Sequence, residues 1–305
     1  MTLPREVLPG RCYLITRRCT QRQFLMRPDR ETNQAFVYCL AEAAARHGIE
    51  VLFTVAMSNH HHTGIHDPRG NYPAFLEHFH KMFAKCQNTL RDRRENFWAA
   101  EPTSVVRLTS PEDVMDKLIY AITNPVKDLL VSKVGEWPGV NSYCTMLEGG
   151  SIRATRPQHF FRENSAMPES VSLAFARPPG FEGLSAKAWA ALLEGRALEV
   201  ERKVRNQGRR RGRSPLGVRA ILRQSWNARP KTLAPRRVLS PRVAARNKWR
   251  RVEALLQNTA FQMLYRDARQ AFQLGIHSVP FPDGTYWLKR FANVVRQGDI
   301  SPWHH

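Results

Sequence analysis

Three consecutive histidines, His60 to His62, follow an apolar stretch within residues 51–65, VLFTVAMSNHHHTGI. Because side chains alternate between the two faces of a strand, His60 and His62 would project together from one face and His61 from the other. Two neutral imidazoles on a rigid strand can hold a divalent cation and leave it open to water, a substrate and one more protein group, which is a catalytic arrangement. A hydrated histidine run at the end of a strand would give the same pattern, because isolated pairs of this spacing are common.

Residues 110–130, SPEDVMDKLIYAITNPVKDLL, begin as a helix, with Ser110 as the N-cap and Pro111 at the first helical position. Pro125 should end or kink this helix. Tyr120 lies off the apolar stripe and Asn124 follows one turn later, so the polar face would present a phenol beside an amide. The positions expected to face a core are Val114, Leu118, Ala121 and Ile122.

A histidine-bound metal beside a tyrosine is suited to phosphodiester chemistry. The metal would polarise the scissile phosphate while the Tyr120 oxygen attacks phosphorus, which leaves a covalent phosphotyrosine and a free 3′-hydroxyl. A phenol with a pKa of about 10 is a weak nucleophile at pH 7. Metal and cationic neighbours are therefore needed to stabilise the charge that develops on the phosphate and the phenolate.

The surrounding sequence predicts the elements that would position these side chains. Strand patterns occupy residues 11–18 and 103–109, and residues 51–57 form an apolar strand that continues into the histidine strand. Amphipathic helical patterns occupy residues 31–48 and 73–91. The order strand, helix, strand, strand, helix, strand, helix predicts an α+β fold, a ferredoxin-like antiparallel sheet with helices on one side.

These segments resemble the HUH single-tyrosine transposases, and within them the REP-associated tyrosine transposase branch. The histidine segment is similar to the metal-binding strand of that family, and LIYAITNPVKDLLV at 118–131 is similar to its catalytic helix. Three flanking segments agree as well: CYLITRR at 12–18, ARHGIEVL at 45–52 and EWPGVNSY at 136–143. The resemblance implies the HUH endonuclease fold over roughly residues 10–145. It also implies Mg²⁺ or Mn²⁺ as the cofactor and these roles: metal ligands His60 and His62, nucleophile Tyr120, and Asn124 as a third metal ligand or phosphate-orienting group.

The histidine strand also departs from the family pattern. The residue between the two histidines is usually apolar but here is His61, and Thr63, Gly64 and Ile65 replace an apolar triplet. A polar His61 on the core-facing side needs a hydrogen-bond partner, so we expect a locally more open strand. An alternative is that His61 ligates the metal from a strand twisted near a bulge.

The positive charge is concentrated in the second half of the chain. The 305 residues carry 47 Lys and Arg against 26 Asp and Glu, a formal net charge of +21. Residues 1–150 hold 18 basic against 16 acidic residues, whereas residues 151–305 hold 29 against 10, and residues 196–251 hold 19 against two. Such a tract is typical of a disordered nucleic-acid-binding arm or of a basic helical surface that orders on its target.

We therefore expect a catalytic domain at 1–148, a Pro/Gly-rich connector at 149–195 and a basic, mainly helical DNA-binding extension at 196–305. Residues 280–291 are expected to form a turn and an aromatic segment that packs back. Five cysteines without a CxxC pair, no apolar run of membrane-spanning length and no signal-peptide pattern predict reduced cysteines and a cytoplasmic location. A helical pattern between 242 and 274 has a possible apolar stripe at Trp249, Val252, Leu256, Met263 and Phe272.

Three functions fit these patterns. The first is a metal-dependent single-strand DNA endonuclease or transposase that nicks and rejoins hairpin-forming DNA through a 5′-phosphotyrosine. The second is a catalytically weak or inactive nucleic-acid-binding regulator that retains the fold, and the third is a histidine-metal hydrolase that uses water, with Tyr120 in a structural role. Single-stranded or hairpin DNA is the expected partner and a membrane is not, and the resemblance allows a monomer or a homodimer.

Overall fold

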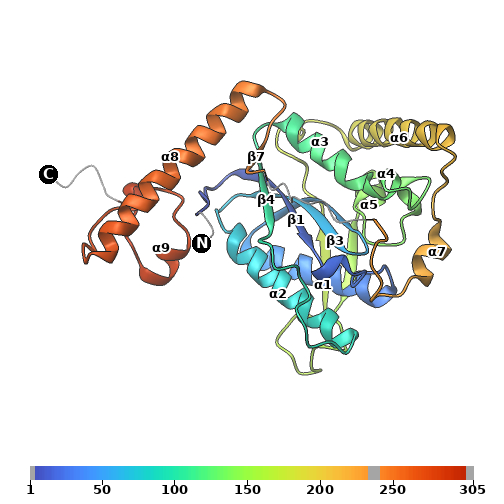
Figure 1. The fold of residues 1–305 in the computed structure, drawn as a ribbon, viewed down its shortest axis with the longest axis horizontal. Helices are drawn as coiled ribbons and strands as arrows, with labels where there is room; N and C mark the ends of the chain where they lie inside the picture. Colours follow the sequence, from blue (N-terminus) through green and yellow to red (C-terminus); the bar gives the residue numbers. More distant parts are fainter. Residues whose placement is uncertain (1–3, 233–240, 300–305) are drawn as a thin grey trace.

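The computed structural model describes residues 4–232 and 241–299 of the chain. It is a mixed α+β structure built on a five-stranded sheet in the order β2-β3-β1-β4-β7 (Figure 1). The first four strands in this order pair antiparallel, and β7 adds a short parallel strand beside β4. The strands are β1 Arg11–Arg18, β2 Glu50–Ala56, β3 His60–Asp67, β4 Ser104–Leu108 and β7 Val243–Ala244.

β1 pairs with β3 in a continuous register that fixes the two faces of the histidine strand. Thr16 lies opposite His62, and Arg17 lies opposite His61. Directly opposite residues of an antiparallel pair share a face of the sheet. Thr16 is therefore a neighbour of the predicted metal ligands, and Arg17 is a neighbour of the histidine on the other face.

Helices cover both faces of the sheet, so the expectation of helices on one side is wrong (Figure 1). α1 (Arg30–His47) and α2 (Tyr72–Leu90) pack together on one face, and α3 (Pro111–Ile122) packs against β2 and β3 on the other. The pattern of β1 explains why both faces need a helical cover: its apolar side chains point alternately to the two faces, and both sets are buried. Tyr13 and Ile15 belong to the core under α1 and α2, and Cys12 and Leu14 to the core under α3.

α3 begins and is interrupted where its sequence predicts. The Ser110 side chain caps its N-terminus, and Pro111 occupies the first turn. After a break at Thr123, the chain continues as α4 (Asn124–Lys127), with Pro125 in its first turn. The predicted interruption at Pro125 is confirmed.

Residues 149–195 do more than connect two parts of the chain, which corrects the expectation for this segment. β5 (Ser151–Thr155) and β6 (Ser170–Ala174) form a two-stranded sheet that packs against α1. α6 (Ala186–Arg210) crosses the expected boundary at residue 195 and packs on α3, α4 and α5. Trp189 and Leu193 of α6 are buried in the core under α3, so the first part of the basic half completes the core of the N-terminal unit.

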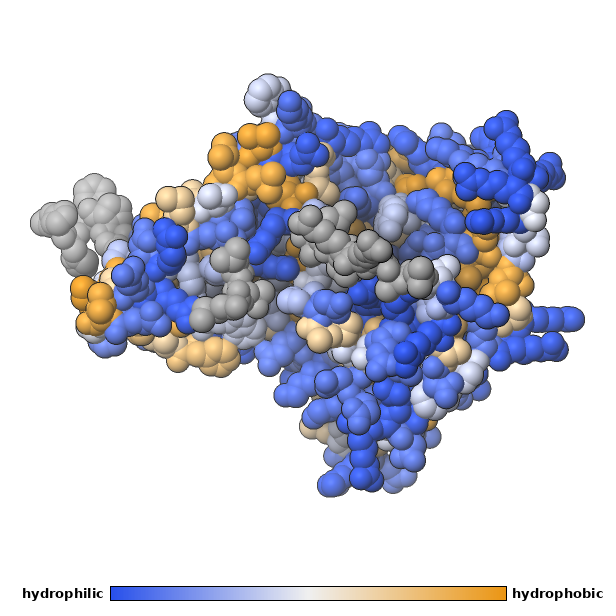
Figure 2. All heavy atoms as spheres, in the orientation of Figure 1, coloured by the Kyte–Doolittle hydropathy of each residue, from blue (hydrophilic) through white to orange (hydrophobic). Residues whose placement is uncertain are grey.

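Four members of the apolar stripe expected on α8 (Lys248–Gln273) are exposed, so the expectation is wrong for them, whereas Phe272 packs against the small core around Phe281. Trp249 and Leu256 are 75% and 65% exposed, and Figure 2 shows hydrophobic side chains gathered over the N-terminal half of this helix. Its buried side chains are Ala254, Phe261 and Ala268, spaced seven residues apart. The remaining short helices are α5 Tyr143–Glu148, α7 Val218–Arg223 and α9 Trp287–Ala292, with 3₁₀ turns at Thr20–Arg22, Val134–Glu136 and Gln297–Asp299.

The C-terminal aromatic segment packs back on the chain, as expected. Phe281 is fully buried, and the Val7 N–H donates to the Gly284 carbonyl at 3.0 Å. All five cysteines are free, and four of them are buried. In the part of the chain that the structure describes, no helix is long and apolar enough to cross a membrane. Arg236 and Arg237 of the basic tract lie outside the described residues.

Candidate active site

His60 and His62 lie on the face of β3 that α3 covers, as strand alternation predicts. Their ring centroids are 4.9 Å apart. β3 is paired on one side with β1 and on the other with β2, so the backbone beneath both rings is held by strand hydrogen bonds. The paired imidazoles therefore have the rigid support that a metal site or a substrate-orienting site requires.

The Nδ1 atom of each ring is engaged by a neighbouring polar group. His60 Nδ1 lies 2.7 Å from Asn59 Oδ1, and His62 Nδ1 lies 2.7 Å from Thr16 Oγ1. Because an amide oxygen can only accept, His60 carries its proton on Nδ1 and an electron pair on Nε2. The Thr16 hydroxyl can accept from His62 in the same way. A hydrogen bond that fixes one ring nitrogen is the usual support of a histidine that binds a metal through the other.

Both rings are neutral at pH 7. Burial lowers the pKa of His60 to about 4, and the charge of Arg18 acts in the same direction. Burial is also the main cause that lowers the pKa of His62 well below its usual value, followed by the neighbouring His60 and His61. A metal binds neutral imidazole, so both side chains are in the protonation state that a metal ligand needs.

α3 and α4 bring Tyr120 and Asn124 to the same face. The Tyr120 ring centroid lies 5.5 Å from that of His62, and the Tyr120 side chain is 41% exposed. Asn124 is buried, with its Nδ2 atom 3.3 Å from His60 Nε2. The four side chains that the sequence singled out therefore form one cluster, with the phenol on its solvent side.

Two lysines flank the Tyr120 ring. The Nζ atoms of Lys127 and Lys117 lie 4.6 Å and 5.8 Å from its centroid. Burial raises the pKa of Tyr120, and Asp128 raises it further, so the phenol is protonated at neutral pH. Cationic groups that approach its oxygen would therefore be needed to stabilise a phenolate.

The cluster borders a basic cavity of about 600 Å³. His62 and Tyr120 line it together with four arginines and Lys117, whereas its acidic residue, Glu101, forms an ion pair with Arg18 at 3.3 Å. His60 lines a second cavity, of about 550 Å³, and Arg18 borders both. The four arginines of the first cavity are Arg5, Arg17, Arg18 and Arg242. An excess of cations around a tyrosine favours an anionic ligand such as a phosphate group.

His61 points to the opposite face and is enclosed in the core under α1 and α2. Its Nε2 atom lies 3.0 Å from His80 Nε2, and its Nδ1 atom lies 3.0 Å from Thr63 Oγ1. Arg17 Nη1, which can only donate, lies 3.1 Å from His80 Nδ1. His80 must therefore donate from Nε2 to His61, and His61 must donate from Nδ1 to Thr63. The predicted need for a partner is confirmed.

The expectation of a locally more open strand is wrong, because His61 is completely buried. Its contacts lie on the face away from Tyr120, and the register between β1 and β3 is continuous through it, so the alternative in which His61 is the ligand does not fit. The other departures have a packing reason. Thr63 bonds to Thr54 at 2.8 Å, and Gly64 leaves room for the Phe53 ring, which a Cβ at this position would overlap.

Several residues around the cluster were not predicted as parts of the site. Asn59 and Thr16 support the imidazoles, and the strand pairing that brings Thr16 to His62 joins segments 46 residues apart. Lys117 precedes Tyr120 by three residues, a spacing that places it on the same helical face. Lys127 comes from α4, beyond the helix break, and Arg242 comes from the distant basic tract.

Within residues 4–232 and 241–299, no three His, Cys, Asp or Glu side chains are grouped so that they could hold a metal. The donors available at the cluster are two imidazoles and the amide oxygen of Asn124. Two Nε2 atoms and one amide oxygen are acceptable ligands for a divalent cation with open positions.

Comparisons with known proteins give one similarity. No protein-family model matches the chain, and no curated protein matches it. A solved structure of a REP-associated tyrosine transposase bound to a REP hairpin aligns with 58% of this chain and 98% of its own, at 16% sequence identity and a TM-score of 0.42.

Proposed function

We propose that the protein nicks and rejoins single-stranded DNA, with Tyr120 as the nucleophile and a 5′-phosphotyrosine as the intermediate. The observation that carries the proposal is the position of the partly exposed Tyr120 phenol, beside His62 and in a cavity lined by four arginines and Lys117. In the reaction, the Tyr120 oxygen bonds to phosphorus as the bond to the 3′ oxygen breaks. The phenol loses its proton, and the departing 3′ oxygen gains one.

A divalent cation, Mg²⁺ or Mn²⁺, fits the residues of this cluster. His60 and His62 would hold it through Nε2, because their Nδ1 atoms are engaged by Asn59 and Thr16. Asn124 directs its Nδ2 atom at His60 Nε2, at 3.3 Å, so its amide would turn over to add its oxygen as a further ligand. When bound, such a cation would polarise the scissile phosphate and help to stabilise the charge of the transition state.

Basic side chains of the protein would stabilise the remaining negative charge, on the phenoxide and on the phosphates of the strand. Lys117 and Lys127, whose Nζ atoms lie 5.8 Å and 4.6 Å from the centre of the Tyr120 ring, would stabilise the phenoxide that develops as the proton leaves. Arg242 lines the same cavity and would bind phosphate oxygens of the strand. We further propose that the sheet, with helices on both faces, is that of an HUH endonuclease, and that the protein acts on hairpin-forming DNA as a monomer or a homodimer.

A denaturing gel tests the proposal directly. Wild-type protein incubated with labelled single-stranded hairpin DNA and Mn²⁺ should give a slowly migrating covalent band. Tyr120→Phe should give none and should keep DNA affinity within a few-fold, because only the attacking oxygen is removed. Tyr286→Phe is a matched control, since it removes a phenolic oxygen that lies outside the cavity of Tyr120.

The other outcomes separate the competing functions. Cleavage that persists in Tyr120→Phe would favour a hydrolase that uses water. A gel shift of the wild-type protein without cleavage would favour a non-catalytic DNA-binding regulator.

The basic half of the chain is proposed to hold the DNA. On α6 the exposed basic residues include Arg205, Arg209 and Arg210. Each phosphate contact contributes about 0.7 to 0.9 to the slope of log affinity against log salt, so changing all three to Gln should flatten the slope by about 2. Affinity for a hairpin at several salt concentrations measures this, and an unchanged slope would remove α6 from the DNA-binding surface. Point changes are preferable to truncation, because Trp189 and Leu193 of α6 belong to the core.

A further inference from the structure

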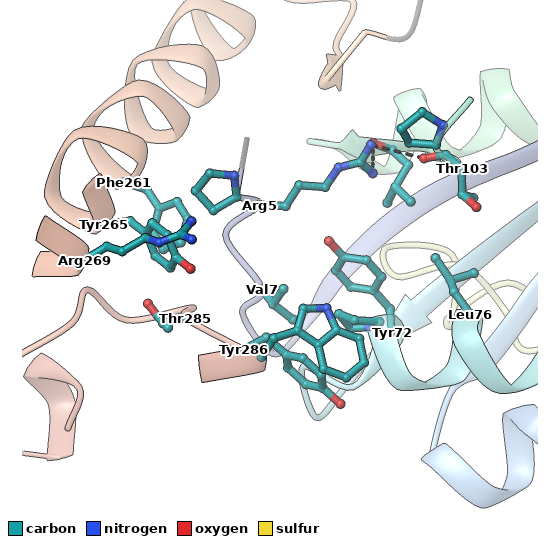
Figure 3. A pocket seen from close by; sticks show the side chains of 15 residues that line it. Arg5, Val7, Tyr72, Leu76, Thr103, Phe261, Tyr265, Arg269, Thr285 and Tyr286 are labelled. Carbon is teal, nitrogen blue, oxygen red and sulfur yellow. Dashed lines mark hydrogen bonds between the residues drawn. The ribbon is translucent and has the colours of Figure 1, made fainter. Parts of the chain in front are cut away.

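A third cavity, of about 460 Å³, lies where the C-terminal elements meet the N-terminal segment, α2 and β4. Figure 3 shows Tyr265 and Arg269 of α8 on one side, Tyr72 and Leu76 of α2 on the other, and Tyr286 below them. The volume lies within the range of about 300 to 1,000 Å³ that is common for pockets that bind small molecules. The site is formed by residues from both ends of the chain.

The lining of this cavity combines aromatic rings with arginines. Its aromatic side chains are Tyr72, Phe261, Tyr265, Tyr286 and Trp287, and its charged side chains are Arg5 and Arg269, with no carboxylate among the described lining residues. Trp287 is 40% exposed and stacks on Phe291 with a centroid distance of 5.5 Å. Flat aromatic rings with nearby guanidinium groups are the chemistry that binds unpaired nucleobases by stacking.

This cavity adjoins the one that contains Tyr120, because Arg5 and Pro102 line both. The Arg5 guanidinium is fixed between them by hydrogen bonds to the carbonyls of Thr103 at 3.2 Å and Val105 at 3.4 Å. A phosphodiester strand that reaches Tyr120 would therefore meet Arg5 at the passage from one cavity to the other.

Arg242 adds a second positive charge at this passage. It lines the Tyr120 cavity, and its pKa is lowered first by burial and then by the charge of Arg5. Among the residues that the structure describes, neither arginine has a carboxylate within ion-pair distance. Two neighbouring guanidinium groups without an acidic partner are suited to the phosphate that links successive nucleotides.

We propose that this aromatic cavity binds one unpaired nucleobase of the DNA strand whose scissile phosphate lies at Tyr120. The inference rests on the proposed function and assigns to the C-terminal elements a role in positioning the single strand. Arg5 and Arg242 would bind the phosphate next to that base, and Tyr265, Tyr286 or Trp287 would stack on it.

Photo-crosslinking tests the location. Full-length Tyr120→Phe protein, which cannot form the covalent intermediate, is bound to a hairpin DNA that carries 5-iodouracil at one unpaired position at a time. After irradiation, mass spectrometry should find one position crosslinked to the peptide of Tyr265 or to that of Tyr286 and Trp287. Crosslinks confined to other peptides would overturn the inference.

Affinity measurements test the stacking without relying on a single protein variant. An abasic site at the crosslinking position should weaken binding by about 5- to 100-fold, the range expected for the loss of one base–aromatic stack. Tyr265→Ala should weaken binding of the intact DNA by a similar factor and should have little further effect on the abasic DNA. Met263→Ala is the control, because it removes an exposed side chain of α8 outside both the cavity and the basic tract and should leave affinity unchanged.

The outcomes separate this inference from the function on which it rests. DNA binding that is unaffected by the abasic site, or that Met263→Ala weakens as much as Tyr265→Ala does, would overturn the base-binding cavity alone. Failure of the Tyr120→Phe protein to bind any single-stranded or hairpin DNA would overturn both proposals.

Discussion

His62 and His61 are neighbours on β3, but His62 borders the basic cavity beside Tyr120, whereas His61 is enclosed between the sheet and the helices α1 and α2. Both rings are neutral and both have Nδ1 engaged by a threonine hydroxyl. They differ at Nε2. In His61 this atom accepts a hydrogen bond from His80, and in His62 it belongs to a ring that lines the cavity.

The comparison shows that protonation state alone does not identify a metal ligand. Burial lowers the pKa of His61 to about 3 and that of His60 to about 4, yet only His60 lies near Asn124. The layer that covers each face of the sheet decides whether a histidine on that face can reach a metal or only packs in the core. α1 and α2 close one face with aromatic rings and His80, and the start of α4 brings a buried amide to the other.

The largest difference is expected between alanine variants of the two faces. His62→Ala should lower nicking by more than about 100-fold, because it removes a proposed metal ligand and not merely the support of one. His61→Ala should leave nicking within about tenfold but lower the free energy of unfolding by about 2–4 kcal/mol, since it opens a cavity and leaves His80 without its acceptor. Nicking assays and urea unfolding of both variants measure the contrast. Similar losses of nicking in the two variants would mean that the faces are not functionally distinct.

The sequence predicted that His60 and His62 share one face of β3 and that His61 lies on the other, because strand alternation is a local property. The predicted positions of β1 and of the start of α3 at Ser110 are confirmed for the same reason, since each depends on residues within a few positions of one another. The grouping of His60 and His62 with Tyr120 and Asn124 was predicted from the family resemblance, and the structure brings the four side chains together. Their metal-binding and catalytic roles stay predictions.

Contacts between distant segments could not be predicted in the same way. His80 lies on α2, and its bond to His61 exists only because α2 packs on that face of the sheet. On α8, two apolar stripes of similar length compete, and nothing local indicates that Ala254 and Phe261 face the protein while Trp249 is exposed. Which stripe is covered depends on the N-terminal segment, which lies far away in the sequence, and on the residues that follow α8.

The closed face should also make the protein sensitive to acid. Burial lowers the pKa of both His61 and His80 below the value of about 6.5 that they have when unfolded, with like charges, including Arg17, as further causes. The unfolded chain therefore takes up protons first, so the stability from these neutral rings is complete above pH 6.5 and is lost as the pH falls toward the folded pKa, about 3 for His61. At pH 5 the loss should be about 2 kcal/mol for His61, and protonation of His80 acts in the same direction.

A double variant, His61→Leu with His80→Leu, isolates this effect. Replacing both partners by apolar groups should cost little at pH 7, because Arg17 still donates to Thr103 and Thr63 still bonds to Thr54. Its free energy of unfolding should fall less than that of the wild type between pH 7 and pH 5, while the carboxylates and the other histidines titrate in both proteins. Parallel curves would mean that the closed face is not the source of the acid sensitivity.

The smallest effect is expected from the hydroxyl that supports the open face. Thr16 holds His62 Nδ1 at 2.7 Å, and Thr16→Val removes this hydrogen bond while keeping the shape of the side chain. Loss of such a support lowers metal affinity by about 10- to 100-fold, and a neutral hydroxyl places the expected loss near tenfold. Titration of Mn²⁺ into the Tyr120→Phe background measures this loss of affinity without turnover.

Thr63→Val is the matched change on the closed face, where the hydroxyl holds His61 at 3.0 Å, and it should lower stability but leave Mn²⁺ affinity unchanged. Equal losses of Mn²⁺ affinity in the two variants would show that metal binding depends on the rigidity of β3 as a whole. The hydrogen bond from Thr16 would then no longer be evidence that His62 is a metal ligand.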